Sequence, residues 1–219
     1  MGDRPRLRDY AAKHGANKLE EESKHYCDLY ERYLPPNYDW GGVARLLEIG
    51  VQKGGSLKMW SDWCPDAEAI HGIDIKEKCK AGPEAYDRRI KVFVGDQGDI
   101  DFLKLFAKTH KPYDVIIDDG SHKMADQRAT MYHLWPLVAP GGLYVVEDLH
   151  TSYWPEFGGG LHLKGTMMEM LQNSTNHLNT WAIRHKRAGG CRYTGAEEMN
   201  IAAIHFHRSI CFIEKGGEL

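Results

Sequence analysis

Short apolar runs alternate with helix-like segments from residue 43 to residue 146, and this alternation constrains the fold more than any other feature of the sequence. Each run ends at a glycine or an acidic residue, as strands do where they enter a turn. The alternation predicts a doubly wound α/β fold, in which helices cover both faces of a mostly parallel sheet. The expected strands are Val43 to Ile49, Ala69 to Ile73, Ile90 to Val94, Tyr113 to Ile117 and Gly142 to Val146, and the expected helices are Ser56 to Trp63, Glu77 to Arg88, Asp99 to Lys108 and His122 to Val138.

The C-terminal part follows a different pattern. Two β-rich runs, Ile201 to His207 and Ile210 to Lys215, are separated only by Arg208-Ser209, which is too short for a helical crossover. We therefore expect a hairpin that adds an antiparallel strand to a seven-stranded sheet. Before it, Thr166 to Leu178 is expected to be a helix, and residues 151–165 and 186–198 are irregular stretches expected to cover a substrate.

The N-terminal residues 1–40 are expected to form an arm and a helix ahead of a single domain at 41–219. Residues 3–18 are charged and predict a mobile arm or lid. Leu19 to Leu34 is expected to be a helix that ends at Pro35-Pro36, because tandem prolines remove backbone donors. An apolar stripe at helical spacing indicates that this helix packs on the domain; it consists of Tyr26, Leu29, Tyr30, Tyr33 and Leu34.

Composition excludes several classes of protein. At 219 residues and 42% hydrophobic, the chain fits one domain. A net charge of −3 with no long basic block argues against nucleic acid as a partner. No stretch approaches the roughly 18 apolar residues of a membrane span, and Met1 to Tyr10 lacks a signal sequence, so we expect a cytoplasmic protein without a membrane partner. The apolar stripes and aromatic loops favour a homo-oligomer.

The turn after the first strand indicates a nucleoside cofactor. A nicotinamide site needs Gly-x-Gly-x-x-Gly, whose second glycine would fall at Gln52, where a side chain obstructs a pyrophosphate. A nicotinamide oxidoreductase is therefore the disfavoured alternative. In an α/β sheet of this kind, acidic residues that end the second and third strands can bind the ribose and the adenine. Asp74 and Asp96 occupy these two positions, with Gln97 beside Asp96.

The glycines of this turn, preceded by Glu48, resemble motif I of the class I S-adenosylmethionine-dependent methyltransferases, which have a Rossmann-like fold. The resemblance implies that Gly50 and Gly54 let the loop approach the methionine part of the cofactor, and that helix amides near Ser56 meet its carboxylate. The cofactor-binding set implied for this chain is Glu48, Gly50, Gly54, Ser56, Asp74, Asp96, Gln97 and Asp118.

Two acidic pairs end neighbouring strands. Asp118-Asp119-Gly120-Ser121-His122 follows one strand, and Glu147-Asp148 ends the next. Carboxylates without clustered soft ligands suit a hard cation such as Mg²⁺, and a neutral imidazole beside them can take a proton from a hydroxyl. Asp118 is expected to point away from the cation, since adjacent residues on a strand face opposite sides. The alternative is that the acidic residues only cap the following helices.

These motifs, with Gly141 to Leu149 and Thr151 to Trp154, resemble the metal-dependent sugar O-methyltransferases of macrolide biosynthesis, of the mycinamicin and macrocin type. The resemblance implies Mg²⁺ ligands at Asp119, Glu147 and Asp148 and a general base at His122. It implies methyl transfer from S-adenosylmethionine to a hydroxyl of a glycosylated natural product. A catechol or another vicinal diol is the alternative acceptor, and a non-catalytic metal-binding protein is the alternative of a different class.

Overall fold

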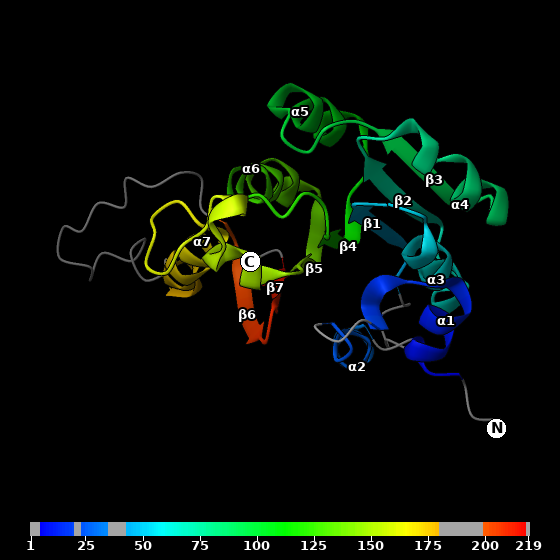
Figure 1. The fold of residues 1–219 in the computed structure, drawn as a ribbon, viewed down its shortest axis with the longest axis horizontal. Helices are drawn as coiled ribbons and strands as arrows, with labels where there is room; N and C mark the ends of the chain where they lie inside the picture. Colours follow the sequence, from blue (N-terminus) through cyan, green and yellow to red (C-terminus); the bar gives the residue numbers. More distant parts are fainter. Residues whose placement is uncertain (1–4, 20–22, 35–42, 180–198, 218–219) are drawn as a thin grey trace.

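The structure is a computed structural model that describes residues 5–19, 23–34, 43–179 and 199–217. Its centre is a seven-stranded sheet with the strand order β3-β2-β1-β4-β5-β7-β6 (Figure 1). The first five strands in this order pair in parallel, whereas β7 is antiparallel to both β5 and β6. The predicted doubly wound sheet with its antiparallel hairpin is confirmed. The strands are β1 Arg45–Ile49, β2 Ala69–Asp74, β3 Ile90–Val94, β4 Tyr113–Asp118, β5 Val138–Val146, β6 Ile201–His207 and β7 Ile210–Lys215.

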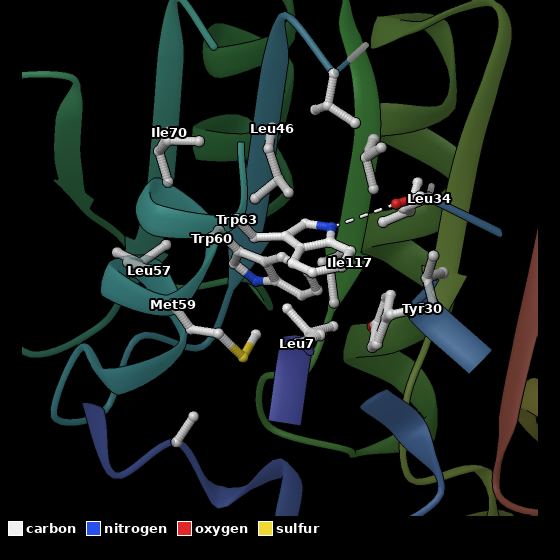
Figure 2. Packing of buried hydrophobic residues seen from close by; sticks show 14 of the residues in the cluster. Leu7, Tyr30, Leu34, Leu46, Leu57, Met59, Trp60, Trp63, Ile70 and Ile117 are labelled. Atoms are coloured by element: carbon white, nitrogen blue, oxygen red, sulfur yellow. Dashed lines mark hydrogen bonds between the residues drawn. The ribbon is translucent and has the colours of Figure 1, made fainter. Parts of the chain in front are cut away.

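Helices cover both faces of the sheet, and a hydrophobic core fills each side (Figure 1). Helices α1 to α3 pack on one face and α5 to α7 on the other. Figure 2 shows Trp60 and Trp63 of α3 between Leu46 of β1 and Leu7 of α1, with the Trp63 indole donating to the Leu34 carbonyl at 3.3 Å. The helices are α1 Leu7–His14, α2 Tyr26–Tyr33, α3 Gly55–Trp63, α4 Ala81–Tyr86, α5 Ile100–Thr109, α6 Met124–Leu134 and α7 Met167–Ser174.

The N-terminal segment differs from the expected mobile arm. It forms helix α1, which buries Leu7 and Ala11 completely, followed by a 3₁₀ turn at Asn17–Leu19. The reason is the i, i+4 spacing of these two apolar residues, which gives a charged helix one narrow buried face. The next helix, α2, begins at Tyr26 rather than Leu19. The expected stop at Pro35-Pro36 and the expected loop at 186–198 lie outside the described residues.

Two boundaries near the end of the parallel sheet were also predicted wrongly. The helix expected from His122 to Val138 ends as α6 at Leu134, and Val138 already belongs to β5. The strand expected to begin at Gly142 begins at Val138, and its pairing with β4 shifts register between Val138 and Leu143. A glycine within a strand commonly marks such an irregularity, and Gly141 and Gly142 lie at this shift.

The carboxyl ends of β1, β4 and β5 lie side by side. Ile49 is paired with Asp118, and Asp118 with Val146, so the residues that follow these strands emerge next to one another. The strand order reverses between β1 and β4, which makes this edge the switch point where α/β sheets bind ligands. Among the described residues, none of the helices combines the length and apolar character that crossing a bilayer requires.

Candidate active site

A cavity of about 800 Å³ opens at the carboxyl edge of the sheet, and this volume suits a small-molecule cofactor. Five residues of the predicted cofactor set line it: Gly50, Ser56, Asp74, Asp96 and Gln97. Asp119 and His122 line it too, so the acidic group and the cofactor turn share one wall. Gly15, Ala16 and Asn17 line it as well, so the N-terminal segment that the sequence predicted as a mobile arm or lid forms part of the site.

Gly50 lies where the turn after β1 meets the end of β4. Its φ is +93°, and a Cβ there would stand 2.0 Å from the backbone oxygen of Asp119. Only glycine fits this approach without displacing backbone. The turn is fixed further by Asp74, whose carboxylate accepts from the backbone N–H groups of Val51 and Gln52 at 3.0 Å each. Burial alone would raise the pKa of Asp74, but these hydrogen bonds outweigh it and lower that pKa.

Glu48, Gly54 and Asp118 do not line the cavity, although all three were in the predicted cofactor set. Glu48 is fully buried and accepts a 2.6 Å hydrogen bond from the Ser56 hydroxyl. A Cβ at Gly54 would meet the Pro83 ring at 2.0 Å, so this glycine serves the packing of α3 on α4. Glu48 and Asp118 lie on strands β1 and β4, where alternate residues face opposite sides of the sheet, and both are buried beneath the cavity wall.

Asp118 is also fully buried, and its carboxylate points away from Asp119 and His122. It accepts from Gln97 Nε2 and from the Tyr144 hydroxyl, each at 3.2 Å. Burial raises the pKa of Asp118 to about 7, with these hydrogen bonds opposing the change. Gln97 in turn accepts from the backbone N–H of Ser121 at 2.5 Å. Asp118 therefore braces the turn that presents Asp119 and His122.

Asp119, His122 and Asp148 form a group whose ligand atoms all lie within 4.8 Å of one another. His122 Nε2 is 3.5 Å from Asp148 Oδ2 and 3.9 Å from Asp119 Oδ1. Both His122 and Asp148 have positive φ values, +57° and +55°, a conformation that costs energy for residues with a Cβ and is typical of functional sites. The ring atom His122 Nδ1 is buried, so Nε2 is the nitrogen that faces the carboxylates.

Glu147, the third expected ligand, lies outside this group. Its Oε1 accepts a 2.6 Å bond from Lys18 Nζ and a 2.5 Å bond from the Tyr30 hydroxyl. Lys18 Nζ also contacts Asp119 Oδ2 at 3.1 Å. Burial and the nearby Asp119 raise the pKa of Glu147, and Lys18 opposes that rise.

The donor set fits a hard divalent cation. Each of Asp119, Glu147 and Asp148 gives one oxygen to a protein donor and leaves the other without a hydrogen bond to any described residue. Asp148 Oδ1, for example, accepts from the Tyr26 hydroxyl at 2.9 Å. Carboxylate oxygens with remaining positions for water or substrate are what Mg²⁺ requires. The sequence pattern had assigned Tyr26 and Tyr30 to packing, and their i, i+4 spacing was the signal that both hydroxyls share one face.

A second, smaller pocket of about 240 Å³ is lined by Glu147 and Asp148, whereas Asp119 and His122 line the large cavity. Its wall combines polar groups with one half-exposed indole, that of Trp154. The His150 ring is held by a hydrogen bond between its Nδ1 and the Ser209 hydroxyl, and it meets Trp154 edge-on at 4.7 Å. The lining residues are Asn17, Lys18, Ser23, Glu147, Asp148, His150 and Trp154. Asn17 lines both pockets, so the N-terminal segment lies next to both of them.

Known proteins are similar to this chain in sequence and in fold. The chain is 38% identical to mycinamicin VI 2''-O-methyltransferase of Micromonospora griseorubida over 185 residues, which are 79% of this chain and 44% of that protein. It is 34% identical to 8-demethyl-8-alpha-L-rhamnosyl tetracenomycin-C 2'-O-methyltransferase of Streptomyces olivaceus, covering 97% of this chain and 55% of that one. The chain thus spans about half the length of the relatives it matches.

A solved structure of MycE methyltransferase from the mycinamycin pathway, in complex with Mg, SAH and mycinamycin VI, superposes with a TM-score of 0.81 at 32% identity. The superposition covers 98% of this chain and 54% of that one. A family model described as a methyltransferase domain matches residues 47–149, which run from β1 to the residue after Asp148. The chain therefore contains a methyltransferase domain, built on the sheet edge that carries the site.

Proposed function

We propose that this chain transfers a methyl group from S-adenosylmethionine to a hydroxyl of a sugar on a glycosylated natural product, with the help of Mg²⁺. One observation carries the proposal: the acidic group with His122 lies between the 800 Å³ cavity and the 240 Å³ pocket. That arrangement suits a cofactor on one side and an acceptor hydroxyl on the other, which meet at the carboxylates. The chain's similarity to the mycinamicin and rhamnosyl tetracenomycin O-methyltransferases supports the same acceptor class.

The large cavity fits the cofactor. Asp74 and Asp96 lie at the ends of β2 and β3, where they can accept hydrogen bonds from the ribose and the adenine amino group. The approach at Gly50 leaves room for the methionine part next to Asp119. S-adenosylmethionine supplies an electrophilic methyl group, and its transfer to a hydroxyl oxygen breaks the carbon–sulfur bond and releases S-adenosylhomocysteine and one proton.

Asp119 and Asp148 would hold Mg²⁺, with the second oxygen of Glu147 completing the carboxylate set. The cation supplies Lewis acidity, which lowers the pKa of a hydroxyl beside it. His122 accepts the released proton at Nε2, the ring nitrogen that faces the acidic group. His150 and Trp154 line the acceptor pocket, where an indole face can pack on the C–H face of a sugar and the imidazole can bond a hydroxyl. The pocket admits one sugar ring more readily than a whole macrolide, so the aglycone stays outside.

Methyltransferase assays with labelled cofactor test the proposal. We expect turnover of a glycoside whose sugar carries vicinal hydroxyls, loss of turnover in EDTA and recovery on addition of Mg²⁺. A simple catechol, the alternative diol, should react more slowly because it lacks the sugar ring that Trp154 and His150 contact. Full activity in EDTA would remove Mg²⁺ from the mechanism, and failure to bind S-adenosylhomocysteine in calorimetry would refute the proposed activity.

The general base can be tested separately. His122→Ala should lower kcat by about 10²- to 10⁴-fold, the usual contribution of a positioned base, while cofactor affinity stays close to wild type. His133→Ala is the matched control, since His133 lies on α6 and does not line either pocket. Equal turnover of His122→Ala and His133→Ala would exclude His122 as the base.

A further inference from the structure

Lys18 is a fully buried lysine in contact with three carboxylates. Its Nζ lies 2.6 Å from Glu147 Oε1, 3.1 Å from Asp119 Oδ2 and 3.4 Å from Glu48 Oε1. Burying an ammonium group is costly unless opposite charges and hydrogen bonds surround it. Here the three carboxylates come from the ends of three adjacent strands, β1, β4 and β5, and one cation serves all of them.

The ammonium connects the cofactor turn with the acidic group. Glu48 accepts from the Ser56 hydroxyl through Oε2, at the start of the helix that lines the large cavity, and faces Lys18 through Oε1. Apart from this 3.4 Å contact, Glu48 Oε1 is a buried oxygen without a hydrogen-bond partner among the described residues. Asp119 divides its oxygens in the same way, since Oδ2 contacts Lys18 whereas Oδ1 faces His122.

Contacts with surrounding residues fix the position of the Lys18 side chain. It belongs to the short 3₁₀ turn between α1 and α2, and its ammonium lies 5.8 Å from the centre of the Tyr30 ring. The Tyr30 hydroxyl binds the same Glu147 oxygen that Lys18 binds. The residue just before it, Asn17, lines both pockets. The long Lys18 side chain is therefore held in one position by these contacts, next to a residue that lines both pockets.

We propose that Lys18 is a positioning residue that acts as a built-in counter-cation for the metal site. It fixes one oxygen each of Asp119 and Glu147, leaves their other oxygens for the divalent cation, and offsets enough negative charge for the acidic group to fold without metal. The same positive charge weakens metal binding, because it lies beside a carboxylate that the metal would share. This inference rests on the proposed function in one respect, namely that a divalent cation binds at Asp119 and Asp148.

The test measures metal binding and stability rather than turnover alone, with Mn²⁺ as an octahedral oxygen-binding probe in place of Mg²⁺. In Lys18→Met we expect a lower Tm in EDTA, a larger rise of Tm on addition of Mn²⁺, and a Mn²⁺ Kd at least about tenfold tighter by paramagnetic resonance, since one nearby positive charge is removed. Lys18→Arg keeps the charge and should bind Mn²⁺ with an affinity close to wild type.

A second variant removes a carboxylate instead of the cation. Glu48→Gln keeps an acceptor for Ser56 but leaves the Lys18 charge less balanced, so Mn²⁺ binding should weaken several-fold. This prediction has the opposite sign and does not depend on whether Lys18→Met folds. The double variant Lys18→Met/Glu48→Gln keeps the net charge of the group and should return the Mn²⁺ affinity toward wild type.

The two proposals can fail separately. If wild type binds Mn²⁺ and Lys18→Met binds it equally or more weakly, with the same rise of Tm, the counter-cation role is refuted and the proposed function stands. The same conclusion follows if Lys18→Met does not fold and Glu48→Gln binds Mn²⁺ as wild type does. If wild type binds S-adenosylhomocysteine but no Mn²⁺, the metal-dependent part of the proposed function is refuted, and the role of Lys18 toward the metal is refuted with it.

Discussion

Replacement of Gly50 by alanine tests whether the cofactor turn and the acidic group depend on one close backbone contact. A residue with a Cβ at the φ of +93° observed here is strained by about 1–2 kcal/mol. In addition, the new methyl group would stand 2.0 Å from the backbone oxygen of Asp119, and backbone cannot rotate away as a side chain can. Overpacking of this kind typically costs about 1–3 kcal/mol, so we expect a total loss of about 2–5 kcal/mol.

Gly141→Ala supplies the matched control. Gly141 also has a positive φ, +76°, but a Cβ there would meet nothing within 4 Å. Gly141→Ala should lose only about 1–2 kcal/mol of stability, which is what the backbone strain costs. The difference in unfolding free energy between the two variants then gives the cost of the clash at residue 50. Urea unfolding with unchanged m-values gives both free energies, and calorimetry with S-adenosylhomocysteine should show weaker binding for Gly50→Ala alone. Equal losses of stability in the two variants, with equal cofactor affinity, would refute the idea that this contact organises the site.

Two further predictions concern stability away from the site. Burial, together with the nearby Arg45, lowers the pKa of His71 from 6.5 to about 4. As the pH falls below 6.5, the unfolded chain therefore binds a proton that the folded chain does not, and wild type should lose stability between pH 6.5 and pH 4. We expect the free energy of unfolding to fall by about 1–2 kcal/mol over this range, after allowance for solvent screening. His71→Gln should lose this part of the pH dependence in thermal melts, and an unchanged pH profile in that variant would contradict the prediction. Arg89 donates to the carbonyl oxygens of Ser61 and Cys64 at 2.8 Å each. Arg89→Ala should therefore lower the free energy of unfolding in urea by about 2–3 kcal/mol, and a loss below about 0.5 kcal/mol would show that water replaces the guanidinium.

The strands were predictable because buried parallel strands are continuous apolar runs with abrupt ends. Ile90–Val94 has the same bounds in the sequence pattern and in the structure, and the hairpin of β6 and β7 follows from its two-residue connection. Helix α1 was not predictable in this way, because only Leu7 and Ala11 of its residues are fully buried and charged residues lie between and after them. One pair of apolar residues at i, i+4 spacing does not distinguish a packed helix from a mobile arm.

The same limit applies to the candidate site. Asp119, His122 and Asp148 could be brought together from sequence, since they follow neighbouring strands whose carboxyl ends share an edge. Whether a residue lines the cavity or lies beneath it depends on which side of the strand it occupies. That is why Glu48 and Asp118, which share the acidic signature, turned out to be buried supports. The alternation along a strand separates Asp118 from Asp119, but the register that decides which of them faces the ligand comes from the fold.

Lys18 is the residue that sequence could least reveal, because 101 and 129 residues separate it from Asp119 and Glu147. Its place in the site nevertheless agrees with electrostatics. Carboxylates that converge at the ends of three strands repel one another, and a buried positive charge offsets that repulsion. A segment that crosses the carboxyl edge, as residues 15–18 do, is the one that can deliver it. In a sequence with several acidic strand ends and a charged N-terminal segment, a lysine in that segment should therefore be considered as part of the site before the segment is regarded as an arm.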